Sequence, residues 1–297
     1  MKLPALSRCL FWSLLASAVL FSACRDEDNE PTAVFSAAED EALASGETEA
    51  VDNLADDVLG ALYSQTSGKT ASGDTLLTEL LPDCATLLLD SIHPDLPYFQ
   101  FTIDFGEENC LCKDGILRRG RILVTASGRF REAGSQRVVT FQDYVAQDRY
   151  QIEGRRTVTS QGANADGQFV AEVKVENARF EHLENGRSLS WNAQRTRTLI
   201  AGAETVALTD NVYRVEGTAS GTTFSGESFT SEINTPLRYR LECFGNRSAR
   251  HAVSGEVRIE SAGNTLRLDY DPNGQAACDR QAEMQFNDRP PRIISLR

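Results

Sequence analysis

The residue types best suited to chemistry lie close together in the segment Asp269-Tyr270-Asp271-Pro272-Asn273-Gly274. Carboxylate or amide oxygens at alternate positions, followed by a glycine at a sharp turn, are typical of the first half of a calcium-binding loop. The twelfth position of this loop is Arg280, where a bidentate Glu is needed, and a polar hairpin turn uses the same residue types. We therefore expect no cofactor, and calcium held by Asp269, Asp271 and Asn273 is the open alternative.

Other residue types used in catalysis form no recognisable constellation in the sequence. The three histidines, His93, His182 and His251, lie far apart and in no metal-binding spacing, and there is no Gly-x-Ser-x-Gly nucleophile turn. Carboxylates are numerous, so a glycosidase pair such as Asp143 with Glu172 stays open. The sequence favours a non-catalytic binding or structural module, with an envelope hydrolase that acts on glycans through paired carboxylates as the alternative.

Arginines recur two residues apart along several predicted strands. Because side chains alternate between the two faces of a strand, the members of each pair are expected on one face. Such a face could stack guanidinium groups against an anionic glycan or bind the carboxylates of an envelope protein. The alternative is a solvated surface on which the arginines lie over Thr and Glu neighbours in cross-strand pairs. The pairs are Arg119 with Arg121, Arg129 with Arg131, Arg195 with Arg197, and Arg238 with Arg240.

The N-terminal segment predicts where the protein works. An apolar run from Leu10 to Phe21 follows a short basic region and is too short to cross a bilayer of about 30 Å. It ends in Phe21-Ser22-Ala23-Cys24, which resembles the cleavage box of bacterial lipoproteins, although Phe21 stands where Leu is usual. The resemblance implies that residues 1–23 are a signal peptide and that acyl chains on Cys24 hold the protein on a membrane. Ordinary secretion after cleavage behind Ala23 is the alternative.

The remaining cysteines suit disulfide bonds, because a cell-envelope compartment is oxidising. We predict one bridge from Cys84 to either Cys110 or Cys112, and a second from Cys243 to Cys278. Each bridge would close a loop of about 26 to 35 residues, which contributes about 3–4 kcal/mol of stabilisation in the chain-entropy model. One thiol of the Cys-Leu-Cys segment is then left over, and a zinc or redox role for that segment is a weaker alternative, since it has no nearby His or second pair.

Charge is distributed unevenly along the chain. The 297-residue sequence has a net charge of -13, and residues 25–68 contain 12 acidic residues and one basic residue. Residues 69–297 contain 31 acidic and 27 basic residues. A body so close to neutral lacks the concentrated basic patch of a nucleic-acid-binding protein, which excludes that class of partner.

The acidic leader divides into a tether and a helix. Residues 24–45 are predicted to be an acidic tether, because Arg25-Asp26-Glu27-Asp28-Asn29-Glu30 repels itself and has nothing to bury. This cluster beside a lipidated cysteine resembles the surface-export signal of Bacteroidota lipoproteins, and the resemblance implies display at the cell surface.

Residues 46–66 are predicted to form an amphipathic helix. Apolar residues recur there at three- and four-residue spacing, and Asp52, Asp56 and Asp57 lie off that stripe. The apolar face is expected to dock on the rest of the chain, since an isolated helix of this length is marginal in water. A scaffold that docks this helix on a partner is the alternative. The apolar positions are Val51, Leu54, Ala55, Val58 and Leu62.

Residues 80–297 are predicted to be an all-β domain. Beyond Pro82 the hydrophobic period changes to two, and about a dozen strands follow, among them a hairpin with Asn185-Gly186 as its two-residue turn. Glycines within strands weaken them unless the sheet bends. We therefore predict an antiparallel meander in a large curled sheet, and a sandwich or barrel-like arrangement is the alternative. The glycines are Gly120, Gly154, Gly217 and Gly255.

One part of this domain resembles a known group of proteins. Asp104-Phe105-Gly106, Cys110, Asp114-Gly115, Arg118 and the stretch from Gly120 to Arg131 are similar to a family of uncharacterised β-rich outer-membrane lipoproteins of Bacteroidota. The resemblance covers most of residues 80–290 and implies a lipid-anchored protein of the bacterial outer membrane. The resemblance implies no particular activity, because the shared motifs are structural.

Overall fold

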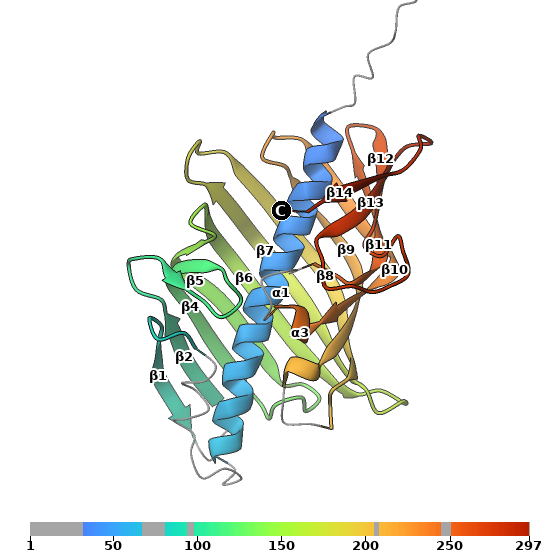
Figure 1. Cartoon of the computed structure of the whole chain (residues 1–297). Helices are drawn as coiled ribbons and strands as arrows, with labels where there is room; N and C mark the ends of the chain where they lie inside the picture. Colours follow the sequence, from blue (N-terminus) through green and yellow to red (C-terminus); the bar gives the residue numbers. More distant parts are fainter. Residues whose placement is uncertain (1–31, 67–80, 94–97, 205–207, 245–250, 297) are drawn as a thin grey trace, which may run out of the picture. The chain divides into compact units, whose positions relative to one another are not determined.

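The computed structural model describes residues 32–66, 81–93, 98–204, 208–244 and 251–296. These residues form one long helix, α1 (Thr32–Thr66), and a single 14-stranded sheet (Figure 1). Two short segments, η1 (Leu208–Asp210) and α3 (Leu241–Phe244), flank the pair β9 and β10. The strands are β1 (Thr86–His93), β2 (Tyr98–Asp104), β3 (Cys110–Leu111), β4 (Leu117–Ser127), β5 (Gln136–Ala146), β6 (Tyr150–Ala163), β7 (Phe169–His182), β8 (Ser188–Ala201), β9 (Val212–Thr222), β10 (Ser228–Arg240), β11 (Ser254–Ser261), β12 (Asn264–Asp269), β13 (Gln281–Phe286) and β14 (Arg292–Ser295).

The sheet is the predicted antiparallel meander. Its strands follow one another in chain order from β1 to β14, except that the two-residue β3 pairs with β4 beside the main path. Such an order needs only hairpin connections, and the predicted hairpin between β7 and β8 is present. Its turn is not the predicted two-residue turn, because residues 183–187 connect the two strands, with Gly186 at a φ of 68°. Because β1 and β14 are edge strands, the sheet is open.

The glycines within strands mark bends, as predicted. Gly120, Gly154, Gly217 and Gly255 all have positive φ values, a conformation that L side chains rarely adopt. The pairing register shifts across Gly120 in β4 and across Gly154 in β6, which is typical of β-bulges. These bulges raise the local twist and let one continuous sheet curve.

Helix α1 crosses the inner face of this curved sheet (Figure 1). At one end Phe35 packs against Phe286 of β13, with ring centroids 5.9 Å apart, and at the other Tyr63 packs against Phe99 of β2, at 4.6 Å. Most residues between Ala37 and Leu62 are buried. The sheet therefore supplies packing partners around the helix, which confirms that the helix docks on the β domain.

Two parts of the helix prediction are wrong. The helix begins at Thr32 rather than at residue 46, so the acidic tether predicted over residues 24–45 is wrong from Thr32 onward. Asp52 does not lie on a solvent-facing side, because its exposed fraction is 0%. The reason is that arginines of the sheet neutralise the helix carboxylates, as described below.

The predicted signal peptide 1–23, Cys24 and tether residues 24–31 lie outside the described residues. In the described ranges, no helix has the length and apolar character needed to cross a membrane.

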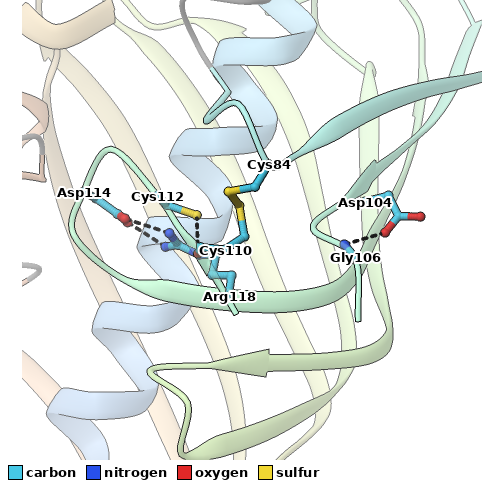
Figure 2. Close-up of a disulfide and its surroundings, with 7 residues drawn as sticks. All are labelled: Cys84, Asp104, Gly106, Cys110, Cys112, Asp114 and Arg118. Carbon is cyan, nitrogen blue, oxygen red and sulfur yellow. Dashed lines mark hydrogen bonds and ion pairs between the residues drawn. A yellow bond between two sulfur atoms is a disulfide. The ribbon is translucent and has the colours of Figure 1, made fainter. Parts of the chain in front are cut away.

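Both predicted disulfide pairs are confirmed. Cys84 bonds to Cys110, rather than to Cys112, and Cys243 bonds to Cys278, with Cα atoms 5.6 and 5.2 Å apart. The thiol left over belongs to Cys112, which is buried beside the first bridge (Figure 2). Burial raises the pKa of this thiol, so the reactive thiolate form is disfavoured.

Candidate functional site

The paired arginines do not form a single exposed face. Arg195 and Arg197 of β8 are both buried against α1, with exposed fractions of 7% and 4%. They share their face of the strand with Leu189 and Trp191, which belong to the core. Alternation therefore holds for this pair, but it directs both side chains inward. The prediction of an exposed binding face is wrong for these two residues.

The other three pairs lie at the surface in different surroundings. Arg119 and Arg121 flank the Gly120 bulge and form ion pairs with Asp148 at 2.7 Å and with Asp104 at 2.8 Å. Arg238 and Arg240 lie on β10, and Arg240 pairs with Glu242. Arg129 and Arg131 lie in the turn between β4 and β5, not on a strand as predicted.

A buried ion network joins α1 to the inner face of the sheet. Asp52 pairs with Arg137 of β5 at 2.9 Å and also with Arg156 of β6. Asp56, one turn further along, pairs with Arg137 and with Arg197 of β8, the latter at 3.0 Å. Three strands are thus tied to one turn of the helix, and sequence patterns missed this network because Arg137 and Arg156 are not in the paired spacing.

A second buried pair fixes the helix nearer its start. Glu41 accepts hydrogen bonds from Trp191 Nε1 at 2.6 Å and from Arg195 Nη2 at 2.7 Å.

The ion network around Asp52 also changes the pKa of this carboxyl. Burial raises the pKa, but the attraction of Arg156, Arg137 and Arg197 outweighs burial and lowers the pKa below its ordinary value. Asp52 therefore stays ionised despite being fully buried.

Beside this network lies a pocket that we call the Arg131 pocket. Its volume is about 90 Å³, and it is lined by the last turns of α1, the β4–β5 turn and the facing parts of β5 to β9. Asp56, Arg137 and Arg197 contribute polar side chains from the ion network. Its aromatic lining residues are Tyr63, Phe130, Phe169 and Tyr213.

Packing holds the aromatic walls in place. Tyr63 donates a hydrogen bond to the backbone oxygen of Gly128, and its ring lies 5.9 Å from that of Phe130. Tyr213 lies against the guanidinium of Arg197, which is 3.5 Å from the ring centroid. The rings are thus fixed by the helix and by the ion network before any ligand enters, which lowers the entropic cost of binding.

Arg131 is the charged group of the pocket that lacks a counter-ion. Its guanidinium carbon lies 4.9 Å from the centroid of Phe130 and 5.3 Å from that of Phe169. Within the described part of the chain it forms no ion pair, and its buried Nη2 atom has no hydrogen-bond partner. A φ of 64° places the residue in the left-handed region, a conformation that is unusual for a residue with a long side chain.

The arrangement is suited to binding an anion that carries an apolar group. Arg137 and Arg197 are already neutralised by Asp52 and Asp56, so the uncompensated charge of the pocket is that of Arg131. A guanidinium donates to carboxylate or phosphate oxygens through several N–H groups. The phenyl and phenol rings beside it would cover the apolar part of such a ligand.

Another candidate site from the sequence is the glycosidase pair of Asp143 with Glu172. Glu172 of β7 pairs with Thr159 of β6, which pairs with Gln136, seven positions from Asp143 along β5. At about 3.3 Å per residue the two positions lie roughly 23 Å apart along the strands, which is too far for the two carboxyls of a glycosidase pair.

The carboxylates of the 269–274 segment cap their own turn. The backbone N–H of Asp271 donates to Asp269, and those of Gln275 and Ala276 donate to Asp271, at 2.7 to 3.0 Å. In the described ranges no group of three or more His, Cys, Asp or Glu residues could hold a metal ion. Calcium binding by Asp269, Asp271 and Asn273 stays a prediction.

Comparisons of the chain with protein-family models, with curated proteins and with solved structures found no match. The fold and the pocket define it as an antiparallel all-β protein whose open sheet packs around one helix. The resemblance to Bacteroidota lipoproteins stays a prediction.

Proposed function

We propose that this chain is a non-catalytic binding protein, anchored by lipid to a bacterial outer membrane, and that its Arg131 pocket receives small ligands with one anionic and one apolar part. The observation that carries the proposal is the uncompensated guanidinium of Arg131 between Phe130 and Phe169. The lipoprotein-like segment at Cys24 supports the anchor, and the acidic cluster after it supports display at the cell surface.

Binding rather than conversion is supported by the state of the reactive groups in the pocket. Both carboxylate oxygens of Asp56 are already engaged, one by Arg137 and the other by Arg197. The phenol of Tyr63 donates to Gly128, and burial raises its pKa. Groups that are already paired can orient a ligand, but they have little capacity to take a proton from it.

Benzoate is a suitable probe, because it combines a carboxylate with one aromatic ring. We expect the full-length protein in detergent to bind benzoate in calorimetric or ligand-observed NMR titrations, and to bind the neutral analogue benzyl alcohol more weakly. Arg131→Gln should weaken benzoate binding about 10- to 100-fold, since a hydrogen bond to a charged group contributes about 1.5–3 kcal/mol.

Arg129→Gln is the matched control, because it removes an exposed arginine two positions away in the same turn. It should leave benzoate binding unchanged. Absence of benzoate binding, or equal losses in the two variants, would contradict the proposed ligand class while leaving the proposed anchor untouched.

The anchor has its own test. Mass spectrometry of the protein purified from its native host should find acyl chains on Cys24 as the first residue. Cys24→Ala should move the protein from the detergent-rich to the aqueous phase, because two or more acyl chains are needed for stable anchoring. Recovery of the unaltered protein in water without added lipid mass would refute the anchor.

A further inference from the structure

A second, larger cavity lies on the outer face of the sheet, which is the face turned away from α1. It is an open groove with a volume of about 610 Å³, and residues of β7 to β11 line it. Ligand pockets in proteins have volumes of about 300–1,000 Å³. Along these strands the side chains alternate between the core and the groove, so the groove is separate from the Arg131 pocket. We call it the outer groove.

The floor of the outer groove consists of exposed, uncharged polar side chains that follow the pairing of the strands. In one row, Gln194 of β8 lies opposite Thr218 of β9. In the next row, Asn192 lies opposite Ser220, which in turn lies opposite Thr230 of β10. Neighbouring strands are about 4.8 Å apart, and the two rows are about 7 Å apart along the strands. The floor is therefore a regular array of amide and hydroxyl groups.

The floor groups are available to a ligand. Asn192 is held in one orientation, because its Oδ1 accepts a hydrogen bond from the backbone N–H of Asn177 at 2.8 Å. Its Nδ2 group is then left to donate elsewhere. Within the described part of the chain, the side chains of the other four floor residues form no hydrogen bond with the protein. A ligand can therefore bind to the floor without breaking an internal hydrogen bond.

The charged residues at the rims of the outer groove are largely neutralised. On β7, Lys174 pairs with Glu176 at 2.7 Å, and on β11, Arg258 pairs with Glu260 at 2.6 Å. Glu232 of β10 lies opposite Arg258 but forms no ion pair in the described ranges. The lining thus contains two basic and three acidic residues. A groove with this balance of charge does not attract a polyanion.

The lining also disfavours an apolar partner. Every lining residue that is exposed or half-exposed is polar or charged, and none of the described lining residues is aromatic. The centres of protein–protein interfaces rely on aromatic and apolar anchors, which this groove lacks. A sugar hydroxyl both donates and accepts hydrogen bonds, as the hydroxyl and amide groups of the floor do. The groove is therefore complementary to a neutral ligand that is covered with hydroxyl groups.

We infer that the outer groove binds a neutral oligosaccharide that lies across β8, β9 and β10. The amides and hydroxyls of the floor exchange hydrogen bonds with the sugar hydroxyls, and the carboxylate of Glu232 accepts from them as well. From β7 to β11 the groove spans four strand spacings, or about 19 Å, which suits a chain of several sugars. This site does not depend on anion binding in the Arg131 pocket.

The test is affinity electrophoresis of the full-length protein in non-ionic detergent, in native gels cast with one polysaccharide each. The neutral probes are dextran, mannan, arabinoxylan and galactan, and dextran sulfate is the anionic counterpart of dextran. At least one neutral probe should retard the protein, and dextran sulfate should not. The double variant Gln194→Ala/Thr230→Ala should weaken the retardation constant about 5- to 100-fold, which corresponds to two hydrogen bonds of about 0.5–1.5 kcal/mol each.

The matched control is Thr140→Ala/Gln142→Ala, which removes the same two residue types from β5, outside the groove. It should leave the retardation unchanged. Both double variants should unfold within about 4 °C of the unaltered protein, because substitutions at the surface have small effects on stability. Arg131→Gln should keep the retardation, and Gln194→Ala/Thr230→Ala should keep benzoate binding, so the failure of one site is distinguishable from that of the other.

Four results would overturn the inference. They are the absence of retardation by every neutral probe, retardation by dextran sulfate, equal losses in the two double variants, and loss of retardation in Arg131→Gln. The first would leave the outer groove as a solvated surface, and the second would assign it to anionic ligands. The last two would place the sugar site elsewhere on the protein.

Discussion

Asp52→Ala is expected to lower the free energy of unfolding by about 3–5 kcal/mol, measured by chemical denaturation at neutral pH. Its carboxylate has an exposed fraction of 0% and pairs with Arg137 and Arg156, which are themselves almost fully buried. Its removal leaves Arg137 paired with Asp56, and leaves Arg156 with Glu49 at 3.6 Å, so the buried arginines are incompletely compensated and far from water. The loss should therefore come from the stranded arginines more than from the missing pair.

An exposed pair on the outer face provides the comparison. Arg258 and Glu260 of β11 pair at 2.6 Å, but both side chains are about half exposed. Glu260→Ala should cost less than about 1 kcal/mol, because water and salt replace such a partner. Equal costs for Asp52→Ala and Glu260→Ala would mean that the helix network does not hold α1 in the sheet.

The sequence was informative where a local rule decides the outcome. Alternation predicted the strands, the Asn-Gly pair predicted the position of the β7–β8 hairpin but not the length of its turn, and glycines within strands predicted bends. The disulfides followed from compartment and spacing, though the choice between Cys110 and Cys112 required the structure. Each of these features depends on neighbours in the chain or on a single residue type.

The surroundings of α1 depend on residues that are far from it in the sequence, and the prediction for them was wrong. The amphipathic pattern predicts Asp52 and Asp56 off the apolar stripe of the helix, and the two-residue spacing predicts Arg195 and Arg197 on an exposed strand face, but Asp52 and both arginines are buried. Each assumption is wrong for the same reason: the arginines on one element neutralise the acids on the other. The sequence of β8 did indicate burial of both arginines. Arg195 and Arg197 lie an even number of residues from the apolar Leu189 and Trp191, so they share the same face of the strand.

The pockets could not be predicted from the sequence for a related reason. The Arg131 pocket combines residues from α1, from the β4–β5 turn and from β7 to β9, which are brought together by the curvature of the sheet. Arg131 itself was singled out by its spacing from Arg129, but its exposure to a pocket results from the turn and from the rings of Phe130 and Phe169. No sequence period connects these residues.

Gly120→Ala is expected to lower the free energy of unfolding by about 2–5 kcal/mol, because a side chain does not fit into the bulge at this position. A Cβ atom at Gly120 would lie 2.1 Å from the backbone oxygen of Asp143, and its φ is 76°. The cost has two parts, since a left-handed conformation costs an L-residue about 1–2 kcal/mol and overpacking typically costs about 1–3 kcal/mol more. Backbone atoms of β5 cannot move aside as a flexible side chain could.

Gly167 separates the two parts of that cost. It lies in the turn between β6 and β7 with the same φ of 76°, but a Cβ atom there would meet nothing within 4 Å. Gly167→Ala should therefore cost only the conformational part, about 1–2 kcal/mol. Denaturation of both variants measures the difference, and the excess in Gly120→Ala is the contribution of close backbone approach at the bulge. If the two variants lost equal stability, β4 and β5 would not be in contact at Gly120, and the inward curvature that brings Arg137 to Asp52 would need another cause.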